Sequence, residues 1–114
     1  MADDVVYINV EEGLGRVMNN TKLFSKLLVK FKGYTHLSEI EAALAEGDME
    51  KARNCAHTLK GLAANLSLIE LYKQVMEFEI QIKAGSLAPD QLSVVRSAYD
   101  QTLIEADKVI AQYA

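Results

Sequence analysis

The chain has 114 residues, of which half are hydrophobic and a quarter are charged, with six Gly and one Pro. This composition is typical of a folded domain and excludes a disordered chain, so we expect a single domain over residues 1–114. The formal net charge of −4 argues against nucleic acid as the main partner, because phosphate binding needs clustered Lys and Arg.

The N-terminal sequence and the cysteine count predict a cytoplasmic protein. The first ten residues, "MADDVVYINV", lack the basic segment and apolar run of a signal peptide. No run approaches the roughly 18 consecutive apolar residues of a membrane span, so we expect no membrane insertion. Cys55 is the single cysteine and can form no internal disulfide. Nothing in the sequence demands an oligomer, and we expect a monomer.

The first part of the chain predicts a short helix followed by a longer one. Asn9 with Glu12 forms a capping-box pattern, and a short helix is expected to follow it before Gly13 and Gly15. Apolar residues then recur at helical spacing through "NNTKLFSKLLVKFKGYTHLSEIEAALAEGD", which predicts a second helix with a possible kink at Gly33.

Local signals divide the rest of the chain into further helices. Gly47 is expected to end the second helix, and Asp48 is a suitable N-cap for the third. Ser67 with Glu70 forms another capping-box pattern, which predicts that a fourth helix begins there. That helix is expected to end near Gly85.

The last helix completes an all-α pattern. Pro89 suits its first turn, and apolar residues at helical spacing continue to the end of the chain. No strand pattern competes. We therefore expect an antiparallel up-down four-helix bundle with a short additional N-terminal helix.

His57 is predicted to lie opposite the leucines of its own helix. On a helical wheel of about 100° per residue, Leu59, Leu62 and Leu66 fall at about 200°, 140° and 180° from His57. These leucines form the predicted core stripe. Cys55 joins them, so we expect a buried, inert thiol that diverges from the imidazole and cannot form a Cys/His nucleophilic pair with it.

The neighbours of His57 on the outward face are Lys60, Gly61 and Ala64, at about 300°, 40° and 340°. Gly in a helix interior costs about 0.5–1 kcal/mol relative to Ala, but small residues let another protein approach the imidazole. A neutral imidazole is a nucleophile near pH 7, and a neighbouring cation can neutralise anionic oxygens attached to it. These features suit a phosphoryl carrier, with a merely solvated surface histidine as the alternative.

The string "AHTLKGLAANL" resembles the signature of histidine-containing phosphotransfer (HPt) domains, which reads His-x-Leu-Lys-Gly followed by small residues. The likeness extends over most of the chain, as far as "LYKQVMEFEIQIKAG". It implies a four-helix bundle that relays phosphoryl groups between aspartates of response-regulator receiver domains, or onward from a hybrid sensor kinase. The resemblance implies a carrier and not an enzyme, with no cofactor of its own, because the receiver supplies the aspartate and a bound Mg²⁺.

The resemblance also implies roles for individual residues. His57 would take the phosphoryl group on Nε2, Lys60 would offset its charge, and Gly61 would keep the face open. Glu79 matches the position from which family members hydrogen-bond Nδ1 of the histidine, and a solvated carboxylate is the alternative. Leu68 is expected close to the docking surface.

Three positions depart from the family pattern. The family usually has Ser or Ala where Leu62 stands, Gly where Ser67 stands, and Gly near Met18. Such changes fit a divergent member or a core altered by design. The alternative function is therefore an HPt-like helical scaffold or interaction module with weak or no phosphotransfer.

No other chemistry-bearing cluster is predicted. His36 has no acidic or second His partner at ligand spacing, so we expect a surface residue. No Gly-rich phosphate loop, zinc-spaced cluster or carboxylate pair occurs, and we expect no metal site.

Overall fold

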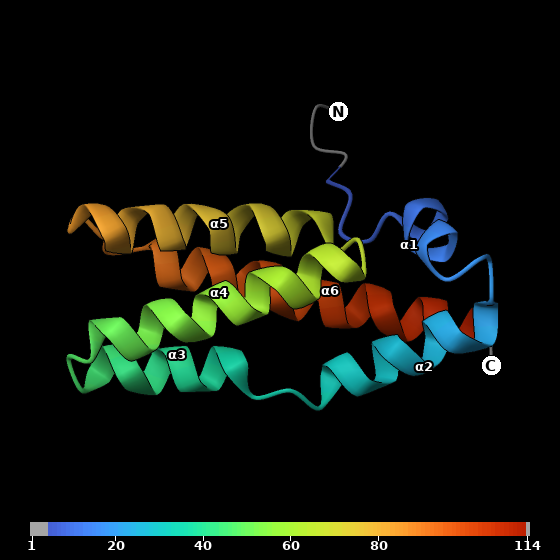
Figure 1. The fold of residues 1–114 in the computed structure, drawn as a ribbon, viewed down its shortest axis with the longest axis horizontal. Coiled ribbons are helices and arrows are strands. Elements are labelled where there is room, and N and C mark those ends of the chain that lie inside the picture. Colours follow the sequence, from blue (N-terminus) through green and yellow to red (C-terminus); the bar gives the residue numbers. More distant parts are fainter. Residues whose placement is uncertain (1–4, 114) are drawn as a thin grey trace.

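The computed structural model describes residues 5–113. Over this range the chain forms six α-helices and no strand (Figure 1). The helices are α1 (Val10–Arg16), α2 (Thr21–Lys32), α3 (His36–Ala45), α4 (Met49–Asn65), α5 (Ile69–Ala84) and α6 (Gln91–Gln112). The predicted all-α class is confirmed. None of the described helices has the length and apolar character needed to cross a membrane.

The long helices form an antiparallel bundle. In Figure 1, α2 and α3 follow one another along one edge and act as one member of the bundle, and α4, α5 and α6 then run in alternating directions. The most extensive contacts are those of α4 with α5 and α3. The short α1 lies at one end of the bundle and contacts α2. The predicted up-down four-helix bundle with a short N-terminal helix is therefore confirmed.

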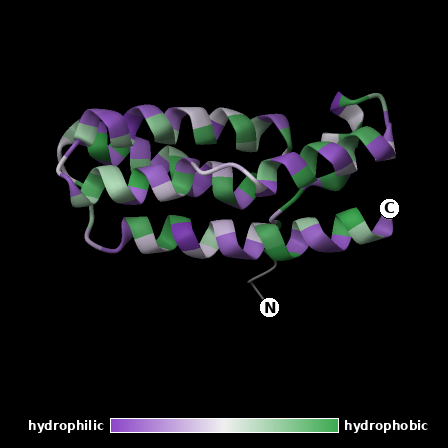
Figure 2. Cartoon of the chain, turned by 90° about the horizontal axis from the view of Figure 1, so that it is seen from below, coloured by the Kyte–Doolittle hydropathy of each residue, from purple (hydrophilic) through white to green (hydrophobic). Residues whose placement is uncertain are grey.

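The core face of α4 agrees with the predicted leucine stripe in part, because Leu59 and Leu66 are buried. Its buried residues are Ala52, Ala56, Leu59 and Ala63, whereas Leu62 is only partly buried. Three of the four buried side chains are methyl groups, which let neighbouring helices approach α4 closely. Along the helices, hydrophobic and hydrophilic residues alternate as expected of amphipathic helices around a shared core (Figure 2).

Several predicted helix ends are confirmed. The side chains of Asn9 and Asp48 each accept a hydrogen bond from the backbone N–H three residues later, at 3.1 and 3.0 Å, and so cap α1 and α4. Gly47 and Gly85 have φ of 76° and 69°, the left-handed conformation that commonly ends a helix.

Other boundaries differ from the prediction. α1 does not stop before Gly13 and Gly15 but includes both. The expected kink at Gly33 is a break, because α2 ends at Lys32 and α3 begins three residues after Gly33. Pro89 lies in the turn before α6 and not in its first helical turn.

The predicted capping box of Ser67 and Glu70 is wrong. Ser67 has a φ of 56°, and its hydroxyl donates a hydrogen bond of 2.7 Å to Oε1 of Glu12 in α1. Leu68 occupies the N-cap position of α5 and makes no side-chain cap. The hydroxyl therefore joins the α4–α5 turn to α1 instead of capping α5.

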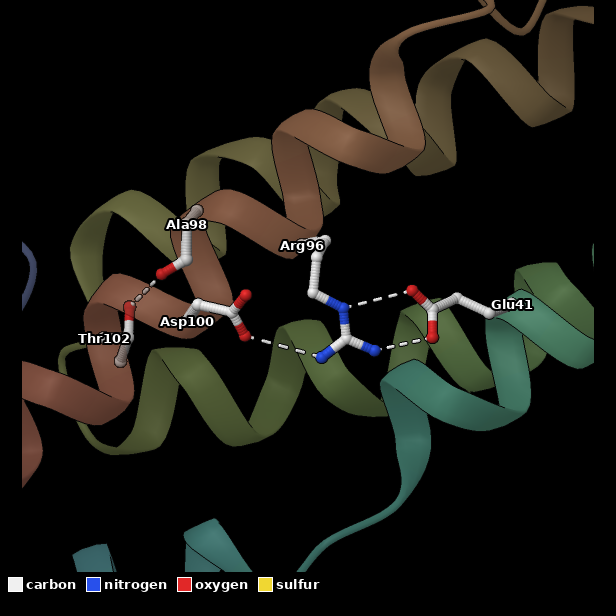
Figure 3. A network of polar contacts seen from close by, with 5 residues as sticks. All are labelled: Glu41, Arg96, Ala98, Asp100 and Thr102. Atoms are coloured by element: carbon white, nitrogen blue, oxygen red, sulfur yellow. Dashed lines mark hydrogen bonds and ion pairs between the residues drawn. The ribbon is translucent and has the colours of Figure 1, made fainter.

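A polar network joins α3 to α6. Arg96 donates two hydrogen bonds to the carboxylate of Glu41, at 3.1 and 2.5 Å, and lies 3.5 Å from Asp100 (Figure 3). In the same helix the buried hydroxyl of Thr102 donates to the carbonyl oxygen of Ala98. The planar guanidinium of Arg96 matches the two carboxylate oxygens of Glu41, so this ion pair fixes the position of α6 relative to α3.

Candidate functional site

His57 lies on the side of α4 that faces away from the core. The side chain is 71% exposed, although the residue just before it, Ala56, is fully buried. The backbone is helical here because Asp48 caps the helix and apolar side chains recur along its inner face. The imidazole is therefore presented to solvent from a rigid element.

Glu79 reaches His57 from the neighbouring helix. Its Oε2 atom lies 3.1 Å from Nδ1 of His57, and its side chain is only 12% exposed. Burial raises the pKa of Glu79, but the hydrogen bonds from Lys60 and His57 outweigh burial and hold the pKa below its ordinary value. An ionised carboxylate can only accept hydrogen bonds, so Nδ1 carries the proton. In a neutral ring this leaves Nε2 with a free lone pair.

The ammonium of Lys60 is paired with the same carboxylate. Its Nζ atom lies 2.7 Å from Oε1 of Glu79, and the lysine side chain is 24% exposed. One carboxylate thus holds both the imidazole and the ammonium group. The structure brings together three residues that the sequence analysis singled out: His57, Lys60 and Glu79.

The two small residues of the outward face differ in their surroundings. A Cβ atom added at Gly61 would meet nothing within 4 Å, so the surface there is open. Ala64 is half-buried, and its carbonyl oxygen accepts a hydrogen bond from the guanidinium of Arg16 in α1. Arg16 carried no signal in the sequence analysis, because only the folded chain brings α1 to the end of α4.

The expectation for Leu68 was wrong. Its side chain is fully buried and belongs to the hydrophobic core. A residue with no exposed surface cannot contribute to docking.

Two of the departures from the family pattern fall at unusual backbone positions. Met18 and Ser67 both have a φ of 56°, in the left-handed region that favours glycine. Met18 is 91% exposed and Ser67 is buried. The third departure, Leu62, is half-buried and packs against the core.

The remaining candidates lie outside this cluster. His36, expected at the surface, is half-buried, and its ring packs edge-on against Tyr34. Cys55 is partly buried, with Sγ 3.9 Å from a carboxylate oxygen of Glu39. Burial, together with the charge of Glu39, raises the pKa of the thiol, which keeps it protonated and unreactive. Residues 5–113 contain no group of three His, Cys, Asp or Glu side chains placed to hold a metal ion.

Comparison with known proteins identifies the family. The family model described as the Hpt domain matches residues 32–106, which include all of α3, α4 and α5. A comparison with curated proteins and one with solved structures each gave no match. The matched segment contains His57, Lys60 and Glu79 and covers more than half of the chain. The chain therefore belongs to the Hpt domain family.

Proposed function

We propose that this chain is a phosphorelay carrier that exchanges a phosphoryl group between His57 and an aspartate of response-regulator receiver domains. Hpt domains are phosphocarriers and not enzymes with a nucleotide site of their own, which is the general role of the family. The observation that supports the specific proposal is the hydrogen bond between Nδ1 of His57 and the ionised Glu79, on a side chain that is 71% exposed.

The chemistry follows from this arrangement. The lone pair on Nε2 of His57 attacks the phosphorus of an aspartyl phosphate. The new N–P bond forms as the P–O bond to the aspartate breaks, and the aspartate leaves as a carboxylate. The imidazole ring becomes cationic because Nδ1 keeps its proton, and the negative charge of Glu79 stabilises that cation. Donation to another receiver reverses these steps.

The neighbouring residues support the exchange. Lys60 offsets negative charge by neutralising Glu79, so the incoming phosphoryl group does not meet an unpaired carboxylate. Gly61 leaves the surface beside the imidazole open, and Ala64 adds only a methyl group to it. The receiver domain, whether free or part of a hybrid sensor kinase, can then bring its aspartate to within reach of Nε2.

One observation favours the alternative of an interaction module without transfer. Met18 and Ser67 have left-handed backbone conformations, and neither is the glycine that is usual in the family. The chain therefore departs from the family's residue pattern outside the His57 site. The contact of His57 and Lys60 with one carboxylate favours transfer, because a scaffold has no need of that arrangement.

The test is transfer from a panel of pre-phosphorylated receiver domains at neutral pH with Mg²⁺. We expect acid-labile label on the wild-type chain and none on the variant His57→Gln. The matched control is His36→Gln, which removes the chain's other histidine and should leave the label in place. Retained label in His57→Gln would refute the assignment. A folded wild-type chain, checked by circular dichroism, that takes label from no receiver would favour the interaction module.

A further inference from the structure

The turn that joins α4 to α5 is bound by α1. The backbone N–H of Asn9 donates to the carbonyl oxygen of Ser67 at 2.9 Å, and the hydroxyl of Ser67 donates to Oε1 of Glu12 at 2.7 Å. The guanidinium of Arg16 donates to the carbonyl oxygen of Ala64, near the end of α4. The N-cap and two residues of α1 thus bind the turn, although α1 lies outside the segment that the family model matches (Figure 1).

Ser67 occupies the position of the turn that glycine suits best. Its backbone N–H donates to the carbonyl oxygen of Ala64, and that of Leu68 donates to the carbonyl oxygen of Ala63, at 3.2 and 2.9 Å. This pair of hydrogen bonds ends a helix in the Schellman motif, which needs a residue in the left-handed conformation. Ser67 has this conformation, with a φ of 56°, although its Cβ atom disfavours it. A contact that stabilises this conformation of Ser67 therefore stabilises the turn.

The hydrogen bond from Ser67 to Glu12 is such a contact. Ser67 is only 2% exposed, so its hydroxyl has little access to water and depends on a partner within the protein. A hydrogen bond to a charged acceptor is stronger than one between neutral groups. The carboxylate of Glu12 also lies 3.5 Å from the guanidinium of Arg16, which holds the carboxylate beside the turn.

The turn sets the register between His57 and Glu79. His57 precedes Ser67 by ten residues and Glu79 follows it by twelve, so both lie at similar distances from the turn, on antiparallel helices. One residue corresponds to about 1.5 Å along a helix axis. A shift of this size is enough to lengthen or misalign the 3.1 Å contact between Nδ1 and Oε2. A change in the turn therefore reaches the imidazole through the two helices.

We propose that the hydrogen bond from Ser67 to Glu12 is a positioning contact, which holds the α4–α5 turn in the conformation that keeps His57 in register with Glu79. Neither Ser67 nor Glu12 contacts the imidazole, and both act through the two helices. The consequence for phosphotransfer rests on the proposed function. When Nδ1 loses its acceptor, the single proton of the neutral ring can reside on Nε2 instead. A protonated Nε2 has no lone pair with which to attack phosphorus.

The test follows the ring proton of His57 by nitrogen NMR of the folded chain, at a pH where the imidazole is neutral. Glu12→Ala removes the acceptor from a side chain that is 46% exposed, so the variant should fold. We expect the ratio of Nδ1-protonated to Nε2-protonated ring to fall by about two- to tenfold, the range to which the net stabilisation by one hydrogen bond corresponds. The matched control is Glu11→Ala, which removes the neighbouring exposed carboxylate of α1 and should leave the ratio unchanged.

Variants of Ser67 separate the hydrogen bond from the backbone conformation. Ser67→Ala keeps the Cβ atom but loses the hydroxyl, so we expect the same fall in the ratio as in Glu12→Ala. Ser67→Gly adopts the left-handed conformation without a contact to α1 and should keep the wild-type ratio. Glu12→Ala added to Ser67→Gly should then have no further effect. A general loss of stability would not produce this pattern.

Two outcomes would overturn the inference. One is an unchanged ratio in Glu12→Ala with the fold intact by circular dichroism. The other is an equal fall in Ser67→Gly and Ser67→Ala, because the backbone conformation of Ser67 would then not connect α1 to the site. Transfer from a phosphorylated receiver tests the consequence, and its rate should fall with the ratio. A wild-type chain that takes no label would refute the proposed function, whereas the ring measurement would still decide this inference.

Discussion

Lys60 and Glu79 form a close ion pair, with 2.7 Å between Nζ and Oε1, on a carboxylate whose other oxygen lies 3.1 Å from Nδ1 of His57. The pair joins α4 to α5 next to the exposed imidazole. Because one carboxylate serves both partners, a change in either the lysine or the glutamate alters the environment of the nucleophile.

Replacing Glu79 should slow transfer without unfolding the chain. In Glu79→Gln the amide oxygen can still accept a hydrogen bond from Nδ1, but the charge that stabilises the cationic ring is gone. A hydrogen bond to a charged group contributes about 1.5–3 kcal/mol, so we expect a loss of about tenfold or more in the transfer rate. Rapid-quench transfer from a fixed receiver measures it. An unchanged rate would show that the carboxylate does not act on the imidazole.

The same variant should change how stability depends on acidity. The pKa of Glu79 is held below its ordinary 4.5, so the unfolded chain binds this proton more readily than the folded chain. Glu79 therefore contributes stability above about pH 4.5, and the contribution is lost as pH falls through the lowered pKa. Urea unfolding of wild type and Glu79→Gln should show a stability difference at pH 7 that shrinks toward pH 3. A difference independent of pH would contradict the ionised pair.

Lys60→Met should slow transfer by a few-fold and leave the bundle folded. The substitution keeps an apolar stem of similar length on α4 but leaves the charge of Glu79 without its partner. Partly exposed ion pairs contribute about 0–1 kcal/mol, so the expected loss of stability stays within that range. Thermal unfolding checks the stability and label transfer checks the rate. A large drop in the melting temperature would mean that the outward face of α4 stabilises the core.

The sequence predicted those parts of the fold that depend on neighbouring residues. Asn9 and Asp48 cap their helices through the backbone three residues later, and this chemistry is local. The prediction that Ser67 caps α5 was wrong, because the Ser67 hydroxyl instead donates a hydrogen bond to Glu12, 55 residues away. The same sequence separation joins Arg96 to Glu41, and no local pattern indicates either contact.

The candidate site was predictable to a similar extent. The helical wheel indicated that His57 faces outward, and the family motif pointed to Glu79. The distance between them depends on how α4 packs against α5. For the core, the wheel was right about Leu59 and Leu66, which are buried, but not about Leu62, and it left out the alanines that make up most of the buried face of α4. A search for hydrophobic periodicity ranks alanine below leucine as a core residue, although small side chains allow the closest packing of helices.

Gly61 offers a test that separates access from stability. A Cβ atom there meets nothing, and Gly costs about 0.5–1 kcal/mol relative to Ala inside a helix. We therefore expect Gly61→Ala to stabilise the chain by about that amount. Gly61→Phe should keep the fold but reduce receiver affinity, because its ring occupies the open surface. Calorimetric titration with an unphosphorylated receiver measures the affinity, and equal binding by both variants would contradict the access argument.

Replacing Met18 with glycine should stabilise the folded chain. Its side chain is 91% exposed and its φ is 56°, a conformation that costs a residue with a Cβ atom roughly 1–2 kcal/mol. Glycine also loses more freedom on folding, so we expect Met18→Gly to stabilise the chain by roughly 0.5–1 kcal/mol. Met18→Ala keeps the Cβ atom and should change little. An equal gain in the free energy of unfolding in both variants would show that the exposed methionine side chain, and not the left-handed backbone, destabilises the wild-type chain.

The two glycines of α1 should respond oppositely to alanine. A Cβ atom at Gly13 would lie 2.6 Å from the ring of the buried Phe24, whereas at Gly15 it would meet nothing within 4 Å. Overpacking of this kind costs about 1–3 kcal/mol, so Gly13→Ala should destabilise the contact between α1 and α2. Gly15→Ala gains helix propensity without a clash and should be neutral or stabilising. Hydrogen exchange of the α1 amides reports the difference even if α1 opens separately from the bundle. Equal exchange in the two variants would mean that α1 does not pack on Phe24 as the structure shows.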